Sequence, residues 1–268
     1  MPENKFPTEI ITLPSKGYFY PENSPLSKGE VEMKYMTARE EDIITSPNLL
    51  KQGIAIDKLL EALIVNKKVN ISDLLIGDKN ALIVGARILA YGKMYDFVTF
   101  NDVGEEVEAT VDLTTLKDKE IDFDKLPPNV NEFPFVLPNS KREVAVRFLT
   151  HRDEKEIERE ATALKKVSST VVKTMTSRMK RLIASVDGNS EKAYVNEFVD
   201  KELLSVDALE LRKYLNSINP DINLTTVATF PDGDEQEVAV EITAQFFWPS
   251  AWTQTLNTRT SLPINIFR

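Results

Sequence analysis

The chain has 268 residues, of which 42% are hydrophobic and 28% charged, and its formal net charge is −9. These proportions indicate a folded protein of one or two domains and exclude a disordered chain. The negative charge argues against a nucleic-acid partner, because a surface that binds phosphates must be basic. Cysteine is absent and His151 is the one histidine, so disulfides are excluded and we expect no bound metal and no cofactor.

Neither a secretion signal nor a membrane span is expected. The N-terminal sequence MPENKFPTEI has acids and prolines where a signal peptide requires basic residues followed by an apolar run. The most apolar window, residues 81–91, contains Arg87 and is too short to cross a bilayer. We therefore expect a soluble, cytoplasmic protein without a membrane partner.

The first thirty residues are expected to form an extended arm. Pro14 and Pro21 exclude a helix, and Gly17 between them can adopt the positive φ of a tight turn. In an extended chain the three aromatic residues between the prolines alternate in direction: Tyr18, Phe19 and Tyr20. The alternating sequence EVEMKY that follows predicts a strand with one buried face.

Residues 31–116 are expected to form a first α+β lobe. Thr37 and Glu40 have the spacing of a capping box, which predicts a helix at about residues 38–45. Pro47 then ends that helix. The other predicted elements of this lobe are helices at about 54–65 and from Asp78, as its cap, to Gly92, and a β-hairpin of residues 95–100 and 107–113.

A proline- and acid-rich stretch, residues 117–132, is expected to link the first lobe to a second one, residues 133–244. Residues 151–187 contain neither proline nor glycine, which predicts one long helix or two abutting helices. Residues 245–268 are expected to form an aromatic C-terminal arm. The other predicted elements are hairpins of residues 133–137 with 143–149 and 224–230 with 237–244, and a helix at about 192–215.

Two stretches of the first half are echoed in the second half. GEVEMKYMTAREED resembles REVAVRFLTHRDEK, and TFNDVGEEVEATVDLT resembles TFPDGDEQEVAVEIT, in the same order along the chain. Short matches of this kind also arise by chance, so coincidence and internal duplication both stay open. Duplication predicts two similar α+β lobes, because two copies are too few for a stacked solenoid.

The sequence contains no recognisable catalytic constellation, and we expect the protein not to be an enzyme. A Ser-His-Asp triad would have to use His151, which lies beside Arg152 and Asp153 at a predicted helix start. A histidine at a helix start or on the surface is the simpler interpretation. The sequence also lacks the G-x-S-x-G motif that presents a nucleophilic serine.

Two aromatic segments are candidates for binding partner proteins. Aromatic residues of the C-terminal arm are of the kind that is enriched at binding hot spots. Prolines stiffen the LPSKGYFYP segment and lower the entropy cost of docking it. Each segment can instead fold back on the chain's own core, and both alternatives stay open. The candidate partner-binding residues are Leu13, Pro14, Tyr18, Phe19, Tyr20, Phe246, Phe247, Trp248 and Trp252.

A run of motifs over residues 8–115 suggests a family. LPSKGYFYP is followed by a predicted strand, by MTAREEDIITSPNLLKQGIAIDKLLEALIV, by D-x-x-A and by R-x-x-x-Y-G. This order resembles the N-terminal pattern of the baseplate hub assembly proteins of T-even-type contractile-tailed bacteriophages. Related sequences can carry cysteines at the tip of the next hairpin, whereas this chain has NDVG there, so a metal role is not implied. The motif residues are Gly17, Thr37, Arg39, Glu40, Asp42, Asp78, Arg87 and Gly92.

The resemblance implies a non-enzymatic protein of virion assembly. It would be a structural component of the baseplate hub or a chaperone of hub assembly, and it would bind other hub or tail proteins. It would act in the host cell cytoplasm and, as a component, also in the tail baseplate of the virion. The alternative is a soluble adaptor, unrelated to phage tails, that binds partner proteins by strand addition at an exposed sheet edge.

Overall fold

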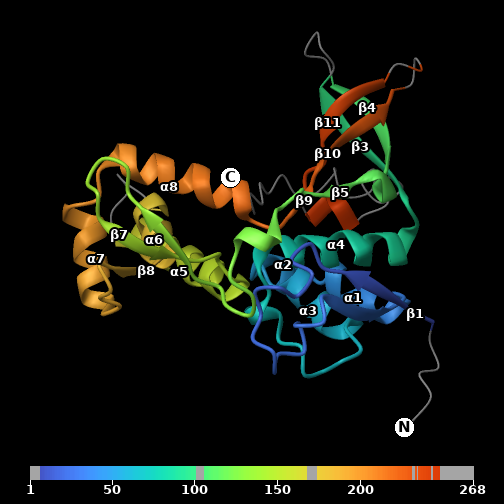
Figure 1. Ribbon diagram of the computed structural model, residues 1–268. Helices are drawn as coiled ribbons and strands as arrows, with labels where there is room; N and C mark the ends of the chain where they lie inside the picture. Colours follow the sequence, from blue (N-terminus) through green and yellow to red (C-terminus); the bar gives the residue numbers. More distant parts are fainter. Residues whose placement is uncertain are drawn as a thin grey trace.

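The computed structural model describes residues 7–100, 106–167, 174–230, 233, 235–242 and 244–247. In this part of the chain, eight helices and eleven strands form a mixed α+β fold, which confirms the predicted fold class (Figure 1). The strands form several small sheets. Buried hydrophobic side chains from both halves belong to one continuous core. None of the described helices combines the length and the apolar character needed to span a membrane.

The first half arranges short elements around one long helix, α4. Its elements are β1 (Thr8–Thr12), β2 (Glu30–Lys34), α1 (Ala38–Thr45), α2 (Pro47–Lys51), α3 (Ala55–Leu63), η1 (Ile71–Asp73), α4 (Ile76–Tyr91), β3 (Met94–Phe100) and β4 (Glu106–Asp112). The predicted strand, the first two predicted helices and the first hairpin are confirmed. Gly92 ends α4 with a φ of 84°, as predicted. Asp78, however, does not cap α4, because the helix begins two residues earlier and Leu75 is its N-cap.

In its described part, the second half contains two hairpins with four helices between them. Its elements are η2 (Leu113–Thr115), β5 (Lys117–Asp118), η3 (Phe123–Lys125), β6 (Phe133–Val136), β7 (Glu143–Val146), α5 (His151–Val167), α6 (Thr174–Leu182), β8 (Ile183–Val186), α7 (Lys192–Lys201), α8 (Ser205–Ile218), β9 (Ile222–Asn223), β10 (Thr225–Thr229), β11 (Glu235–Ala239) and η4 (Ala244–Phe247). Both predicted hairpins are confirmed. The helix predicted at 192–215 is two helices, α7 and α8.

In their described part, residues 151–187 contain two helices, α5 and α6, as one of the two predicted alternatives has it, and these helices do not lie in line. The side chains of Glu160 and Arg181 form an ion pair of 2.7 Å, whereas one continuous helix would separate these residues by about 30 Å. Glu154 and Arg178 form a second pair, also of 2.7 Å. The chain therefore reverses direction between α5 and α6, and the acidic start of α5 pairs with the basic end of α6. The segment then ends in strand β8, which was not predicted.

The N-terminal segment is held by tight turns and does not run extended beyond β1. Gly17 has a φ of 76°, and its C=O accepts a hydrogen bond from the Tyr20 N–H. Because of these turns, Phe19 and Tyr20 are both buried, with 2% and 5% of their surface exposed. The predicted alternation of the three aromatic side chains is therefore wrong.

The segment predicted as a linker, residues 117–132, is packed against the rest of the protein. β5 pairs with β9, and Leu126 is buried. The Tyr18 hydroxyl donates to the Leu126 C=O at 3.0 Å, and the Asn129 N–H donates to the Tyr18 C=O at 2.7 Å. The proline-rich composition correctly indicated an irregular path, but the path is fixed by these contacts.

The two acidic hairpins form one sheet that both halves share. Its strand order is β11-β10-β4-β3, and Thr229 of β10 lies opposite Thr110 of β4. Figure 1 shows this sheet standing above α4, apart from β7 and the helices α5 to α7. The second half is thus interlocked with the first and is not an independent lobe.

The sequence echo has a structural counterpart at two helix starts. The Thr37 N–H and hydroxyl both donate to the Glu40 carboxylate, at 3.1 and 2.5 Å. Lys34 of the preceding strand pairs with the same carboxylate at 2.8 Å. In the second half the corresponding roles belong to Thr150, Asp153 and Arg147.

A buried aspartate near the start of a long helix is the second shared feature. Asp78, in the sequence LLIGD, accepts hydrogen bonds from the turn of LPSKG, and Asp207, in LLSVD, accepts them from the turn of LPNSK. Both aspartates have an exposed fraction of 0%. These features recur in the same order, so the echo is a repeat of structure as well as of sequence. We call β1 to β4 the first repeat and β6 to β11 the second repeat.

The repeats differ most in an insertion after the first turn. Residues 18–28 of the first repeat have no counterpart, because Lys141 of the second turn directly precedes Arg142. The insertion contains all three aromatic residues of LPSKGYFYP. It closes tightly on itself: a Cβ added to Gly17 would lie 2.3 Å from the Ser27 C=O oxygen.

Two glycines with similar backbone angles allow the tightness of the insertion to be tested. Gly17 and Gly53 have φ values of 76° and 67°, but a Cβ at Gly53 meets no atom within 4 Å. The variant G53A should lose about 1 kcal/mol of unfolding free energy from backbone strain alone. G17A should lose roughly 3 kcal/mol, because the clash adds to the strain. Urea denaturation measures both, and equal losses would show that the insertion is not tightly closed.

Candidate functional site

Helix α4 carries three buried charged residues. Asp78, Lys79 and Arg87 have 0%, 8% and 4% of their surface exposed. Buried charges require a partner or hydrogen bonds, since they have lost their hydration. Each of the three binds a different part of the chain. The N-terminal insertion, the second repeat and the C-terminal turn η4 therefore all meet at α4 (Figure 1).

The Asp78 carboxylate holds the N-terminal segment. The Ser15 N–H and hydroxyl donate to it at 2.9 and 2.7 Å, and the Tyr20 hydroxyl donates at 2.6 Å. The Leu75 N–H donates in turn to the Tyr20 hydroxyl at 2.8 Å. Burial raises the pKa of Asp78 to about 6, although these hydrogen bonds favour the charged form. The insertion is therefore fixed to α4 by a network of buried hydrogen bonds.

Phe19 lies between the two repeats. Its ring is edge-on to Phe133 of β6 and to Phe148, with ring centroids 5.5 and 5.0 Å apart. Next to it, Tyr18 contacts the ring of Phe123 at 5.2 Å. Such aromatic pairs contribute roughly 0.5–1.5 kcal/mol each beyond the burial of their surface. The aromatic residues of LPSKGYFYP thus anchor the second repeat of the same chain.

Arg87 holds the C-terminal turn η4. Its Nε donates to the Phe246 C=O at 2.8 Å, and its Nη1 donates to the Gly92 C=O at 3.2 Å. The guanidinium also lies 5.1 Å from the centre of the Tyr91 ring. The Phe246 ring packs edge-on against Tyr95 of β3, at 4.9 Å. Arg87 therefore joins the end of α4, the shared sheet and η4.

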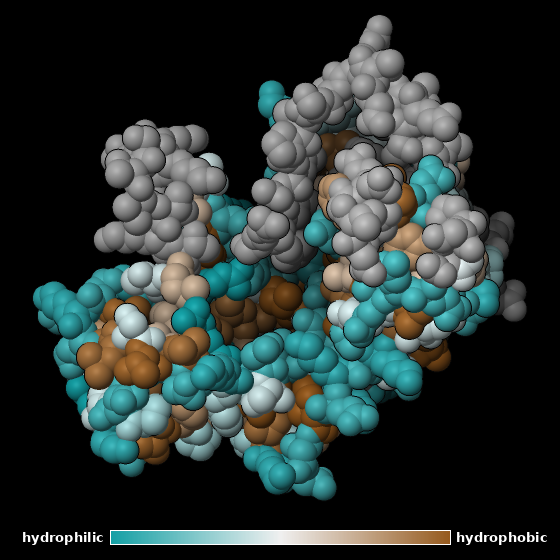
Figure 2. All heavy atoms as spheres, turned by 90° about the horizontal axis from the view of Figure 1, so that it is seen from above, coloured by the Kyte–Doolittle hydropathy of each residue, from teal (hydrophilic) through white to brown (hydrophobic). Residues whose placement is uncertain are grey.

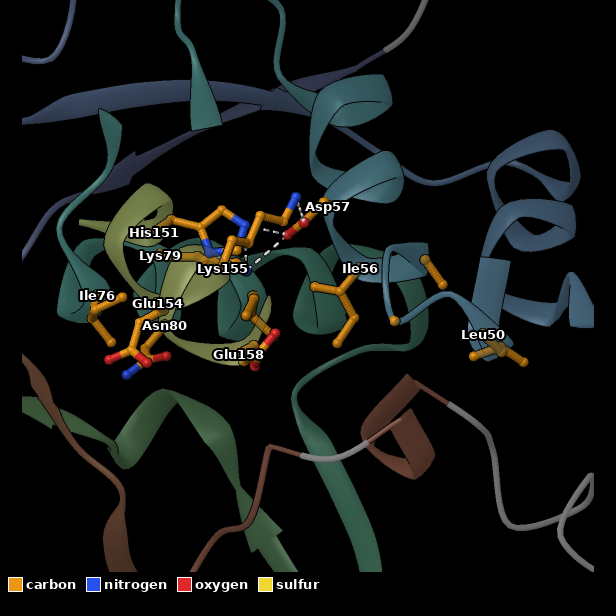
Figure 3. Close-up of a pocket in the computed structure, with 13 residues that line it drawn as sticks. Leu50, Ile56, Asp57, Ile76, Lys79, Asn80, His151, Glu154, Lys155 and Glu158 are labelled. Atoms are coloured by element: carbon orange, nitrogen blue, oxygen red, sulfur yellow. Dashed lines mark hydrogen bonds and ion pairs between the residues drawn. The ribbon is translucent and has the colours of Figure 1, made fainter. Parts of the chain in front are cut away.

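Lys79 belongs to a buried cluster of charges between the repeats. Its Nζ donates to the Asp57 carboxylate at 2.8 Å, and His151 Nε2 lies 2.9 Å from the same carboxylate. Lys155 Nζ lies 2.5 Å from its other oxygen. Figure 3 shows these four side chains converging from α3, α4 and α5. The cluster therefore ties the second repeat, through α5, to two helices of the first.

The electrostatics of the cluster favour a charged Asp57 carboxylate. Burial alone would raise the pKa of Asp57, but the hydrogen bond from His151 and the two lysines outweigh burial and lower it. Burial lowers the pKa of Lys79, and this effect outweighs that of the neighbouring Asp57 carboxylate, which raises it. A lysine must lose its proton to act as a nucleophile, and a carboxylate at 2.8 Å stabilises the protonated form. The cluster is thus suited to binding the helices together.

The recess beside the cluster is small. Its volume of about 60 Å³ has room for a few water molecules, whereas small-molecule sites typically measure at least roughly 300 Å³. The thirteen described residues that line it include no serine, threonine, cysteine or tyrosine. Apolar residues of the first repeat, among them Leu50, Ile56 and Ile76, form much of its wall.

The motif residues of the family resemblance are mostly parts of this framework. Four of them belong to α4 or to the turns beside it: Asp78 and Arg87 lie in the helix, Gly92 ends it, and Gly17 lies in the N-terminal turn. Thr37 and Glu40 form the hydrogen-bonded start of α1. The three motif residues that are exposed are Arg39, Asp42 and Gly92. His151 begins α5, as one interpretation expected, and it is buried.

The candidate partner-binding residues that are described lie in the chain's own core. Tyr18 is half-buried, and the others are buried: Leu13, Pro14, Phe19, Tyr20, Phe246 and Phe247. The described residues of the two aromatic segments therefore pack on the chain's own core. Trp248 and Trp252 lie outside the described residues.

Sequence reasoning missed the cluster around Asp57. A signal was available for Lys79, because it is a charged residue within the apolar run that forms α4. The match of LLIGD with LLSVD, a third echo, would also have drawn attention to Asp207. Nothing in the sequence pairs Asp57 with His151 and Lys155, since α3 and α5 meet only in the folded chain.

No family model, no curated protein and no solved structure matches this chain.

Two ion pairs between the repeats provide a matched test of the cluster. D57A should lose on the order of 3 kcal/mol of unfolding free energy, because it leaves buried cations without their carboxylate. D73A removes the carboxylate paired with Arg152 at 2.6 Å, which is 54% exposed, and should lose less than about 1 kcal/mol. Urea denaturation measures both. A loss for D57A as small as that for D73A would contradict a binding role for the cluster.

Proposed function

We propose that this protein is a non-enzymatic component or assembly chaperone of the baseplate hub of a contractile phage tail. It binds other hub or tail proteins, in the host cytoplasm during assembly and, as a component, in the virion. The proposal rests on the resemblance carried by LPSKGYFYP, TAREED and the motifs around Asp78 and Arg87.

One observation supports this proposal most strongly. The residues that carry the resemblance are connected through α4: Asp78 binds Ser15 and Tyr20, and Arg87 binds the Gly92 C=O. Motif residues with these contacts maintain a shape and need not surround a substrate. A family defined by such residues is expected to act through its surfaces.

The charged recess adds a second argument. Four of its charged or polar side chains pair with one another, as Asp57 pairs with Lys79, His151 and Lys155. A catalytic site instead directs groups toward a space that a substrate can occupy, and about 60 Å³ is too small for that. An enzymatic role is therefore the weaker hypothesis.

The shared sheet favours a second candidate function, an adaptor that binds partners by strand addition. β3 is an edge strand of the sheet. Its residues Met94, Val98 and Phe100 are 49%, 63% and 64% exposed. Apolar side chains along an unpaired edge are typical of sites that accept an added strand.

The decisive experiment compares infections with and without an intact gene. If the proposal is correct, a phage with the interrupted gene produces no complete baseplates by electron microscopy, and the tagged full-length protein co-purifies with hub proteins of assembly intermediates. Complementation with the wild-type gene should restore complete tails. Normal infectious tails without the protein would contradict the proposal.

Variants on the sheet edge separate the two candidate functions. V98K/F100K places charges on β3 and should block strand addition there, while V136K changes a valine of similar exposure, 55%, on β6. The adaptor hypothesis predicts that only V98K/F100K abolishes binding of the co-purified partner. Equal binding by both variants would contradict strand addition at β3.

A further inference from the structure

The second repeat docks on the first through the junction between β7 and α5. The His151 N–H donates to the Leu74 C=O at 2.8 Å, and the Ile76 N–H donates to the Leu149 C=O at 3.4 Å. Leu75 lies opposite Thr150 in an isolated β-bridge. The sequence LTHR of the second repeat thus covers the residues that lead into α4.

The equivalent surface of the second repeat is uncovered. Leu204 and Val206, in LLSVD, and Leu209 on the next turn of α8 are 48%, 47% and 43% exposed. Leu75, the counterpart of Leu204, is only 2% exposed. We call Glu202, Leu204, Val206 and Leu209 the α8 face. Figure 2 shows apolar side chains at the surface at the end of the molecule where α8 begins.

Each chain also carries an unused counterpart of the docking junction. The sequence MTAR between β2 and α1 corresponds to LTHR, and we call its residues, Met36 to Arg39, the junction surface. In the described part of the chain, the Met36 C=O and the Ala38 N–H form no hydrogen bond. The Leu203 C=O and the Ser205 N–H, which lie beside the α8 face, likewise form no hydrogen bond among the described residues. These four groups correspond to those that form the two hydrogen bonds between the repeats, which are the Leu149 C=O, the His151 N–H, the Leu74 C=O and the Ile76 N–H.

We propose that the α8 face of one molecule binds the junction surface of a second copy. This contact would repeat between molecules the docking that joins the two repeats within one molecule. Figure 1 places the start of α8 and helix α1 at opposite ends of the protein. Association is therefore head-to-tail, and such a contact produces a ring where it closes and a filament where it does not.

Charge at the two surfaces is complementary. Within the chain, Arg152 of the docking junction pairs with Asp73 at 2.6 Å. The counterpart of Arg152 on the junction surface is Arg39, which is exposed, and the counterpart of Asp73 on the α8 face is Glu202. Glu202 also pairs with Arg142 of its own chain at 2.8 Å. The second contact thus brings together the same pair of opposite charges.

Two differences make the contact between molecules weaker than the one within the chain. Ile183, directly after α6, pairs with Val146 as Ile64, directly after α3, pairs with Met33. This match makes Thr176 the counterpart of Asp57, and Ala208 corresponds to Lys79, so the buried charge cluster is not repeated. In the first repeat the Pro220 backbone lies so close to Gly77 that no side chain fits there. The second repeat has Val206 at the corresponding position. The contact therefore depends on apolar side chains and the peripheral ion pair, which suits reversible assembly.

Sedimentation velocity over a range of concentrations tests the proposal with the full-length chain. The wild type should associate reversibly. V206E/L209E on the α8 face and A38E/R39E on the junction surface should each weaken association roughly 30-fold or more. V227E, at a valine that is 54% exposed on the shared sheet, is the matched control and should associate like the wild type. Circular dichroism and thermal unfolding verify that the variants are folded.

A mixture of the two defective variants distinguishes head-to-tail from symmetric association. Each variant keeps the surface that the other has lost, so an equimolar mixture should form a 1:1 dimer that does not grow further. A mixture that stays monomeric, a wild type that is monomeric throughout, or association that V206E/L209E leaves unchanged would each overturn the proposal. Association that appears only after residues 248–268 are deleted would also overturn it, because the chain's own C-terminal segment would then occupy the α8 face.

Discussion

A carboxylate that is withdrawn from water must be given hydrogen-bond donors, and this requirement fixes the path of the N-terminal segment. The donors for Asp78 are Ser15 and Tyr20, which lie on either side of a tight turn. Once both are bound to α4, Phe19 between them can only enter the space beside the second repeat. The positions of the two repeats relative to each other therefore depend on this buried acidic side chain as well as on the Asp57 cluster.

The second repeat meets the same requirement with different donors. Asp207 accepts three N–H bonds, from the backbone and side-chain nitrogens of Asn139 at 2.8 and 3.0 Å and from the Ser140 N–H at 3.0 Å. Burial alone would raise the pKa of Asp207, but these donors outweigh it and lower the pKa to about 2. Asp78 accepts hydrogen bonds from two hydroxyl groups and from only one N–H group. One architecture thus holds two aspartates whose pKa values move in opposite directions.

Local sequence signals predicted local structure well. The Thr37–Glu40 capping box located α1, Gly92 located the end of α4, and period-two patterns located the hairpins. Features that depend on contacts between distant residues were not predictable: the reversal between α5 and α6 and the partners of Asp57. The sequence left open whether the aromatic residues bind a partner or the chain's own core for the same reason, because only the fold shows that Phe19 is enclosed by rings from the other repeat.

The central claim is that the two aspartates are buried hydrogen-bond acceptors at equivalent places in the two repeats. The most direct test is an NMR titration of the side-chain carboxyl carbons, assigned by comparison with D78N and D207N. The account predicts that Asp78 titrates near pH 6 and Asp207 near pH 2, on opposite sides of the ordinary value of 3.8. If both carboxyls titrate close to 3.8, neither aspartate is held as described and the account is contradicted.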